Sequence, residues 1–164
     1  MDLWTTPIRD ELEMLPTRSK ENAAGPVAWV VFTFLRMLRW LGNDWATRTY
    51  ERFIQNIGDV IYYEGAPPTR SIRMHEAVHT WQHRHLGQLR FLWRYYATRD
   101  GRRHAEAQAY AVEVVLFGRS AEERARAASD PVYAMGWEPA EARALIDRYV
   151  AAYRRDWELE VPRA

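Results

Sequence analysis

The chain has 164 residues, enough for one domain with a buried core, and 48% of them are apolar while 27% are charged. Lysine and arginine (23 residues) nearly balance aspartate and glutamate (22 residues), so no net field is present to attract nucleic acid or anionic lipid. Cysteine is absent, which excludes disulfides and thiolate metal sites. Any metal must therefore be held by histidine and carboxylate side chains.

The first 25 residues mix charged residues, prolines and a glycine without a sustained period. We therefore expect an N-terminal arm over residues 1–25, followed by a single compact domain over residues 26–164. The chain starts without the basic residues and apolar stretch of a secretory signal, so we expect a cytoplasmic location by default.

Residues 27–41 form the most apolar segment of the chain. The segment falls short of the roughly 20 apolar residues that a membrane-spanning helix needs, and it contains Arg36 and Arg39. We predict a buried or groove-covering helix here and no transmembrane span. The alternative for this segment is a surface helix that docks a protein partner or lies on a membrane.

Two short runs of β-branched and aromatic residues follow, at residues 50–55 and 60–63. The sequence Asn-Ile-Gly-Asp between them, at residues 56–59, is typical of a turn, so the pattern predicts a β-hairpin. Gly65 and two prolines then end the predicted sheet.

The remainder of the chain is predicted to be helical. Ser71 is a candidate N-cap, Asp100-Gly101 indicates a turn, Gly118 ends a helix, and Ser120 with Glu123 matches a capping box. The predicted helices cover residues 73–86, 89–97 and 105–117, a short stretch after residue 120, and residues 139–157. The predicted fold class is α+β and mostly helical, with a small antiparallel sheet before a central helix. Its core spans residues 50–117, and its C-terminal helices span residues 120–160.

The segment that carries chemistry is His75-Glu76-Ala77-Val78-His79. Two histidines four residues apart on a helix face the same way and can share one metal ion. Glu76 lies beside them, where a carboxylate can contact a metal-bound water. Zinc lowers the pKa of such a water to about 7, so the residue types predict a hydrolytic site with Glu76 as the general base.

A catalytic zinc site usually has three protein ligands, so one further ligand is expected. Glu106, on a separate predicted helix with small alanine neighbours, is the favoured candidate. His85 competes with it, but six residues of unbroken helix turn it roughly 240° away from His79. His104 and Glu113 are the remaining alternatives.

These motifs resemble those of the compact gluzincin-type metallopeptidases, including the minigluzincins. The resemblance covers residues 50–117: a strand at 58–63, the sequence HEAVHTWQ at 75–82, and EAQAY at 106–110. It implies a zincin-type active-site helix packed on a second, glutamate-bearing helix. It also implies zinc held by His75, His79 and Glu106, Glu76 as catalytic base, and a strand that binds an extended peptide or protein substrate by edge addition.

The chain departs from the thermolysin pattern beside the glutamate ligand, where it lacks the preceding Asn and the following Ser-Asp pair. Tyr95, Tyr96 and His104 are the candidates for holding the oxyanion. A metzincin arrangement is the other zincin possibility, because His75, His79 and His85 have its spacing and Met135 could mimic its methionine turn. Gln82 argues against it, since that arrangement needs a glycine at this position.

Two functions follow from these expectations. The first is a zinc metallopeptidase in which Glu76 activates water for peptide-bond hydrolysis. The alternative is a catalytically silent zinc-binding structural or adaptor module of a larger assembly, with residues 27–41 as its docking segment. His83, His85 and His104 are expected to be surface or hydrogen-bonded histidines, and the aromatic residues from Trp81 to Tyr96 are expected to pack the core.

Overall fold

The computed structural model describes residues 6–7, 9–15, 18–21, 33, 36–37, 40, 55–57, 60–63, 67–130 and 136–158. These residues are mostly helical, as predicted. The elements are α1 (Arg9–Met14), β1 (Arg18–Glu21), β2 (Gln55–Ile57), β3 (Val60–Tyr63), α4 (Arg70–Leu86), α5 (Gln88–Ala97), α6 (Arg99–Phe117), α7 (Ala121–Ala128) and α8 (Pro139–Asp156).

The strands pair in the order β1-β3-β2. β2 runs antiparallel to β3, with Asn56 opposite Ile61, whereas β1 runs parallel to β3, with Ser19 opposite Ile61. The parallel partner comes from the N-terminal segment, which the hairpin pattern alone did not indicate. Because β3 has a partner on both sides, it has no free edge for a peptide, contrary to the expectation for this strand.

The helix that carries the histidine pair, α4, begins one residue after Thr69. The Thr69 hydroxyl accepts a hydrogen bond from the Ile72 amide at 3.4 Å, so Thr69 is the N-cap and the prediction of Ser71 was wrong. The helix continues to Leu86 and ends at Gly87, whose φ of +81° is readily adopted by glycine. An unbroken α4 fixes the direction of every side chain from residue 70 to residue 86.

Helix α6 starts six residues earlier than predicted. The Thr98 side chain accepts a hydrogen bond from the Gly101 amide at 3.1 Å, so Asp100 and Gly101 form the first helical turn and not a loop. The other end agrees with the prediction, because Gly118 adopts a left-handed φ of +62° and ends the helix.

The last two helices follow their sequence signals. Ser120 caps α7 by accepting a hydrogen bond from the Glu123 amide at 3.4 Å, as the capping box predicts. Pro139 is the first residue of α8, where its missing N–H has no consequence for the helix.

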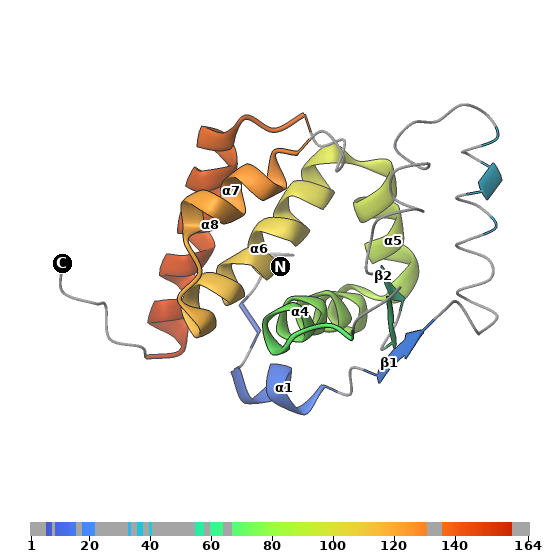
Figure 1. Cartoon of the computed structure of the whole chain (residues 1–164), viewed down its shortest axis with the longest axis horizontal. Coiled ribbons are helices and arrows are strands. Elements are labelled where there is room, and N and C mark those ends of the chain that lie inside the picture. Colours follow the sequence, from blue (N-terminus) through green and yellow to red (C-terminus); the bar gives the residue numbers. More distant parts are fainter. Residues whose placement is uncertain are drawn as a thin grey trace.

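Helix α6 lies at the centre of the molecule, with α4 and α5 on one side and α7 and α8 on the other (Figure 1). Its alanines at 105, 107, 109 and 111 are fully buried, which lets the neighbouring helices approach closely. The ligand-bearing helices α4 and α6 therefore pack directly against each other.

The described part of the N-terminal segment belongs to the same core. Leu12 and Leu15 are buried in the main hydrophobic cluster. The indole N–H of Trp81 donates to Glu11 at 3.2 Å, and that of Trp157 donates to the Pro7 carbonyl at 2.9 Å. Burial of these apolar side chains packs α1 against the main core.

The predicted helix over residues 27–41 lies outside the described residues, apart from Thr33, Arg36, Met37 and Trp40. Met135 and the predicted strand residues 50–54 also lie outside them. Among the described helices, none combines the length and the apolar character that crossing a membrane would require.

Candidate metal centre

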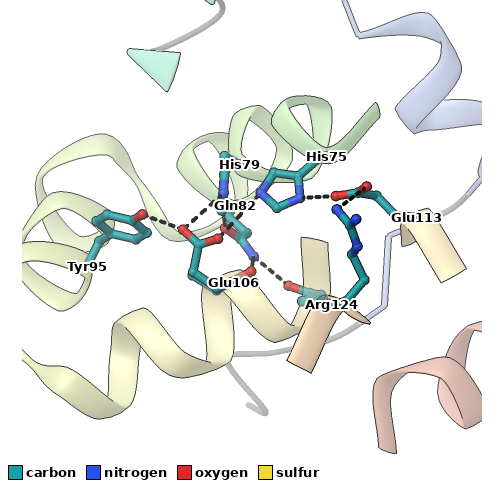
Figure 2. A network of polar contacts seen from close by, with 9 residues as sticks. His75, His79, Gln82, Tyr95, Glu106, Glu113 and Arg124 are labelled. Atoms are coloured by element: carbon teal, nitrogen blue, oxygen red, sulfur yellow. Dashed lines mark hydrogen bonds and ion pairs between the residues drawn. The ribbon is translucent and has the colours of Figure 1, made fainter. Parts of the chain in front are cut away.

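Three side chains from two helices converge on one point. His75 and His79 project from α4 and Glu106 from α6, and one potential ligand atom of each lies within 4.8 Å of the other two. The Nε2 of His75 is 3.4 Å from Oε2 of Glu106, and the Nε2 of His79 is 3.6 Å from Oε1 (Figure 2). All three residues are buried.

The spacing of these atoms fits a metal ion. Ligand atoms bound at about 2.1 Å to a tetrahedral ion lie about 3.4 Å from one another. The observed separations of 3.4 and 3.6 Å, each to a different oxygen of the Glu106 carboxylate, are close to this value and longer than an ordinary N–H···O hydrogen bond. Two imidazole nitrogens and one carboxylate are also a donor set that suits a divalent transition metal. This buried group could therefore hold a metal ion.

The imidazole of His75 is oriented by a second carboxylate on α6. Its Nδ1 donates to Oε1 of Glu113 at 2.8 Å, so in the neutral ring the lone pair lies on Nε2, toward Glu106. Glu113 also accepts hydrogen bonds from Ser71 at 3.0 Å and Arg124 at 3.3 Å. Three elements, α4, α6 and α7, thus fix this carboxylate.

The imidazole of His79 has a different support. Its Nδ1 lies 2.8 Å from Oε1 of Gln82, one turn further along α4. Gln82 is fully buried and is not a helix-surface residue. Both histidines therefore use Nδ1 for an orienting contact and turn Nε2 toward Glu106.

Glu106 itself is held by Tyr95, whose hydroxyl donates to Oε1 of the carboxylate. Of the candidates for holding an oxyanion, Tyr95 is thus at the site, although its hydroxyl is bonded to the ligand carboxylate. His104 instead lies 2.8 Å from the Tyr149 hydroxyl and takes no part in the cluster. The side chain of Tyr96 lies outside the described part of the structure.

Glu76 is a buried carboxyl beside the three-residue group. Burial raises its pKa to about 8; the positive charge of His75 opposes this shift, and the negative charges of Glu106 and Glu113 add to it. In the metal-free protein Glu76 is therefore largely protonated at neutral pH.

The charges in the cluster compensate one another. Burial would lower the pKa of His75, but its contacts with the carboxylates of Glu106 and Glu113 outweigh this effect and raise the pKa to about 10. Burial would raise the pKa of Glu106, but contact with His75 and His79 lowers it to about 2. Burial lowers the pKa of His79. Without metal, a protonated His75 therefore sits between two carboxylates and supplies the positive charge that they need.

The other histidines lie apart from this cluster. His85 is exposed and stacks on Trp81 with ring centroids 4.6 Å apart, because α4 continues without a break past Gln82. His83 is buried against Phe91, with ring centroids 4.1 Å apart. The expectation that His83 is a surface or hydrogen-bonded residue was wrong, because its ring is buried and its Nδ1 has no hydrogen-bond partner among the described residues. Burial lowers the pKa of His83 to about 4.

Sequence reasoning missed the supporting role of Glu113, which it weighed only as a ligand. Its position seven residues after Glu106, two helical turns along the same face, is a signal that could have indicated this role. The contribution of Arg124 had no signal in the sequence, because α7 reaches the site only through tertiary packing.

No protein-family model, no curated protein and no solved structure matches this chain. The gluzincin resemblance therefore stays a prediction, and function is inferred from the geometry and chemistry of the site.

Proposed function

We propose that the protein is a gluzincin-type, zinc-dependent metallopeptidase-like hydrolase. The observation that carries this proposal is the convergence of His75, His79 and Glu106 from two packed helices, with the buried carboxyl of Glu76 next to the first of them. Three protein ligands leave one position of a tetrahedral ion free, which is the pattern of catalytic and not of structural zinc sites.

The residues that would hold zinc are His75 and His79 through Nε2 and Glu106 through its carboxylate. Zinc bound there would polarise a substrate carbonyl and lower the pKa of a water molecule at the site. The fixed rings of His75 and His79 support this use, because little reorganisation is needed before a metal binds.

Glu76 is the general base in this proposal. Its carboxylate accepts a proton from the attacking water and then passes it to the leaving amine of the cleaved peptide bond. The positive charge of a zinc ion bound beside Glu76 would oppose the effect of burial, which raises the pKa of Glu76 to about 8 in the metal-free protein, and so favour the ionised carboxylate that a base requires.

The test is the substitution Glu76→Gln, which keeps the size of the side chain and removes the base. We expect hydrolysis of a quenched-fluorescence peptide library to fall by a factor of about 10² to 10⁴. Zinc content, measured by elemental analysis, should remain at one ion per chain. Glu123→Gln, an exposed change on α7, is the matched control. Undiminished turnover in the Glu76→Gln protein would show that the mechanism is wrong.

The second candidate is a catalytically silent zinc-binding structural or adaptor module. The observation that favours it is the deep burial of the group, whose side chains are 11%, 8% and 4% exposed for His75, His79 and Glu106. In that case the native protein should bind zinc and lose thermal stability on chelation, yet cleave no member of the peptide library.

A further inference from the structure

We propose that Gln82 is a positioning residue that sets which ring nitrogen of His79 faces the metal position. We further propose that it ties that ring to the part of α6 carrying Glu106. The inference rests on the proposed metal site, but the proton position that it assigns on His79 can be observed without any metal.

Gln82 makes three polar contacts inside the protein, at a position where its side chain is fully buried. Its Oε1 lies 2.8 Å from Nδ1 of His79. Its Nε2 donates to Oε1 of Gln108 at 2.8 Å and to the backbone carbonyl of Ala105 at 3.2 Å. The amide therefore uses its acceptor on α4 and both of its hydrogens on α6 (Figure 2).

The contact with Ala105 determines the orientation of the amide. A backbone carbonyl oxygen can only accept a hydrogen bond, so the Gln82 atom beside it must be the NH₂ group. The opposite amide orientation would place two carbonyl oxygens against each other in a buried site and lose a hydrogen bond, which is costly there.

The orientation of Gln82 in turn determines the proton on His79. Because the amide oxygen faces Nδ1 and can only accept, Nδ1 must carry the hydrogen. In the neutral imidazole the lone pair then lies on Nε2, the atom that is 3.6 Å from Glu106. Gln82 thus selects the tautomer of His79 that can bind a metal on the Glu106 side.

The same side chain also links the two ligand-bearing helices. Its partners on α6, Ala105 and Gln108, stand immediately before Glu106 and two residues after it. Ala105 is fully buried, so α6 lies close enough for Gln82 to reach its backbone. A shift of α6 relative to α4 would break these contacts before Glu106 moved far from His79.

A neutral amide suits this position better than a carboxylate. His75 already has the charged Glu113 as its acceptor, and Glu106 adds a second negative charge to the cluster. A glutamate at position 82 could still accept from His79, but it would have no hydrogen for Ala105 or Gln108 when ionised. The Gln82→Glu variant therefore keeps the acceptor that selects the tautomer of His79 and loses the two hydrogen bonds by which residue 82 links α4 to α6.

The experiment is long-range ¹H–¹⁵N NMR of the histidine rings in the metal-free protein at pH 8, combined with zinc affinity measured by competition with a chelating dye. The native protein should show His79 with hydrogen on Nδ1. Gln82→Met, similar in size and without polar groups, should lose this preference and weaken zinc binding by a factor of about 10 to 100. Gln82→Glu should keep the hydrogen on Nδ1 while zinc binding weakens. Ser71→Ala, which removes a hydrogen bond to Glu113, the support of His75, should leave the tautomer of His79 unchanged.

Hydrogen on Nε2 of His79 in the native metal-free protein would overturn the inference, and this measurement needs no variant to fold. Unchanged tautomer and unchanged zinc affinity in a folded Gln82→Met protein would also overturn it. If the native protein bound no zinc but showed hydrogen on Nδ1, the proposed function would fail while the assignment of Gln82 would stand.

Discussion

Oε1 of Glu113 lies 2.8 Å from Nδ1 of His75. Glu113 stands two helical turns after Glu106 on the same helix, α6. One face of α6 therefore supplies both a candidate ligand and the carboxylate that orients another ligand. The hydrogen bond raises the basicity of the His75 ring and fixes its direction.

Replacing Glu113 by Gln should weaken zinc binding without unfolding the protein. The amide oxygen can still accept from His75, but the negative charge is lost, and changes in such supporting residues typically reduce metal affinity by a factor of about 10 to 100. Dye competition measures the affinity, and exposed Glu122→Gln on α7 is the control. Equal affinities for Glu113→Gln and the native protein would contradict the orienting role.

Glu106 and His85 should differ sharply as ligands. Glu106→Gln removes a negatively charged donor from the converging group, so we expect bound zinc to be lost. His85→Ala removes only an exposed ring stacked on Trp81, so we expect one zinc ion per chain to remain. Elemental analysis of the two purified variants decides between them. Loss of zinc from the His85 variant alone would favour the metzincin arrangement.

Metal binding should release a proton, and zinc affinity should rise with pH. With its pKa raised to about 10, metal-free His75 is protonated at pH 7 to 9 and must lose that proton to bind zinc. One proton released corresponds to a roughly tenfold gain in affinity per pH unit. Calorimetry in buffers with different ionisation enthalpies counts the protons. A pH-independent affinity over this range would contradict the protonated His75.

The metal-free protein should lose stability in both directions from neutral pH. The raised pKa of His75 contributes stability that is complete below pH 6.5 and is lost as pH rises toward 10. The lowered pKa of Glu106 contributes stability that is present above pH 4.5 and is lost as pH falls toward 2. Thermal unfolding of chelator-treated protein as a function of pH measures the loss of stability on the alkaline side and on the acidic side. His75→Asn should reduce the loss of stability on the alkaline side, while the raised pKa of Glu76, about 8, leaves part of that loss in place. A stability profile that this substitution leaves unchanged would contradict the role of His75.

Gly101→Ala should destabilise the protein even though alanine favours helices. A Cβ at this position would lie 2.6 Å from both the Arg94 carbonyl oxygen and the Thr98 hydroxyl oxygen, where there is no room for it. We expect a loss of about 1–3 kcal/mol in the free energy of unfolding, measured by urea denaturation. Gly118→Ala is the comparison, because its Cβ meets no atom within 4 Å and the strain comes only from φ of +62°. A stabilised Gly101→Ala protein would show that the α5–α6 corner can relax.

Features that depend only on neighbours along the chain could be predicted from the order of the amino acids. The four-residue spacing of His75 and His79 places both rings on one side of any helix, and Ser120, Pro139 and Gly118 set helix ends through local hydrogen bonding and φ. The mostly helical character could therefore be predicted, whereas the cap at Thr69 was misplaced because Ser71 has equivalent local chemistry and its hydroxyl instead bonds Glu113.

Which side chains meet in space depends on how the helices pack against one another. Sequence reasoning ranked Glu106 above His85, but the convergence depends on α6 packing against α4 through buried alanines. The contacts of Glu113 with His75 and Arg124, and those of Gln82 with α6, became visible in the same way, since hydrogen-bond distances of about 3 Å between helices follow from packing and not from separation along the chain. The incorporation of α1 into the core has the same origin, because burial of Leu12 requires a surface made by distant residues.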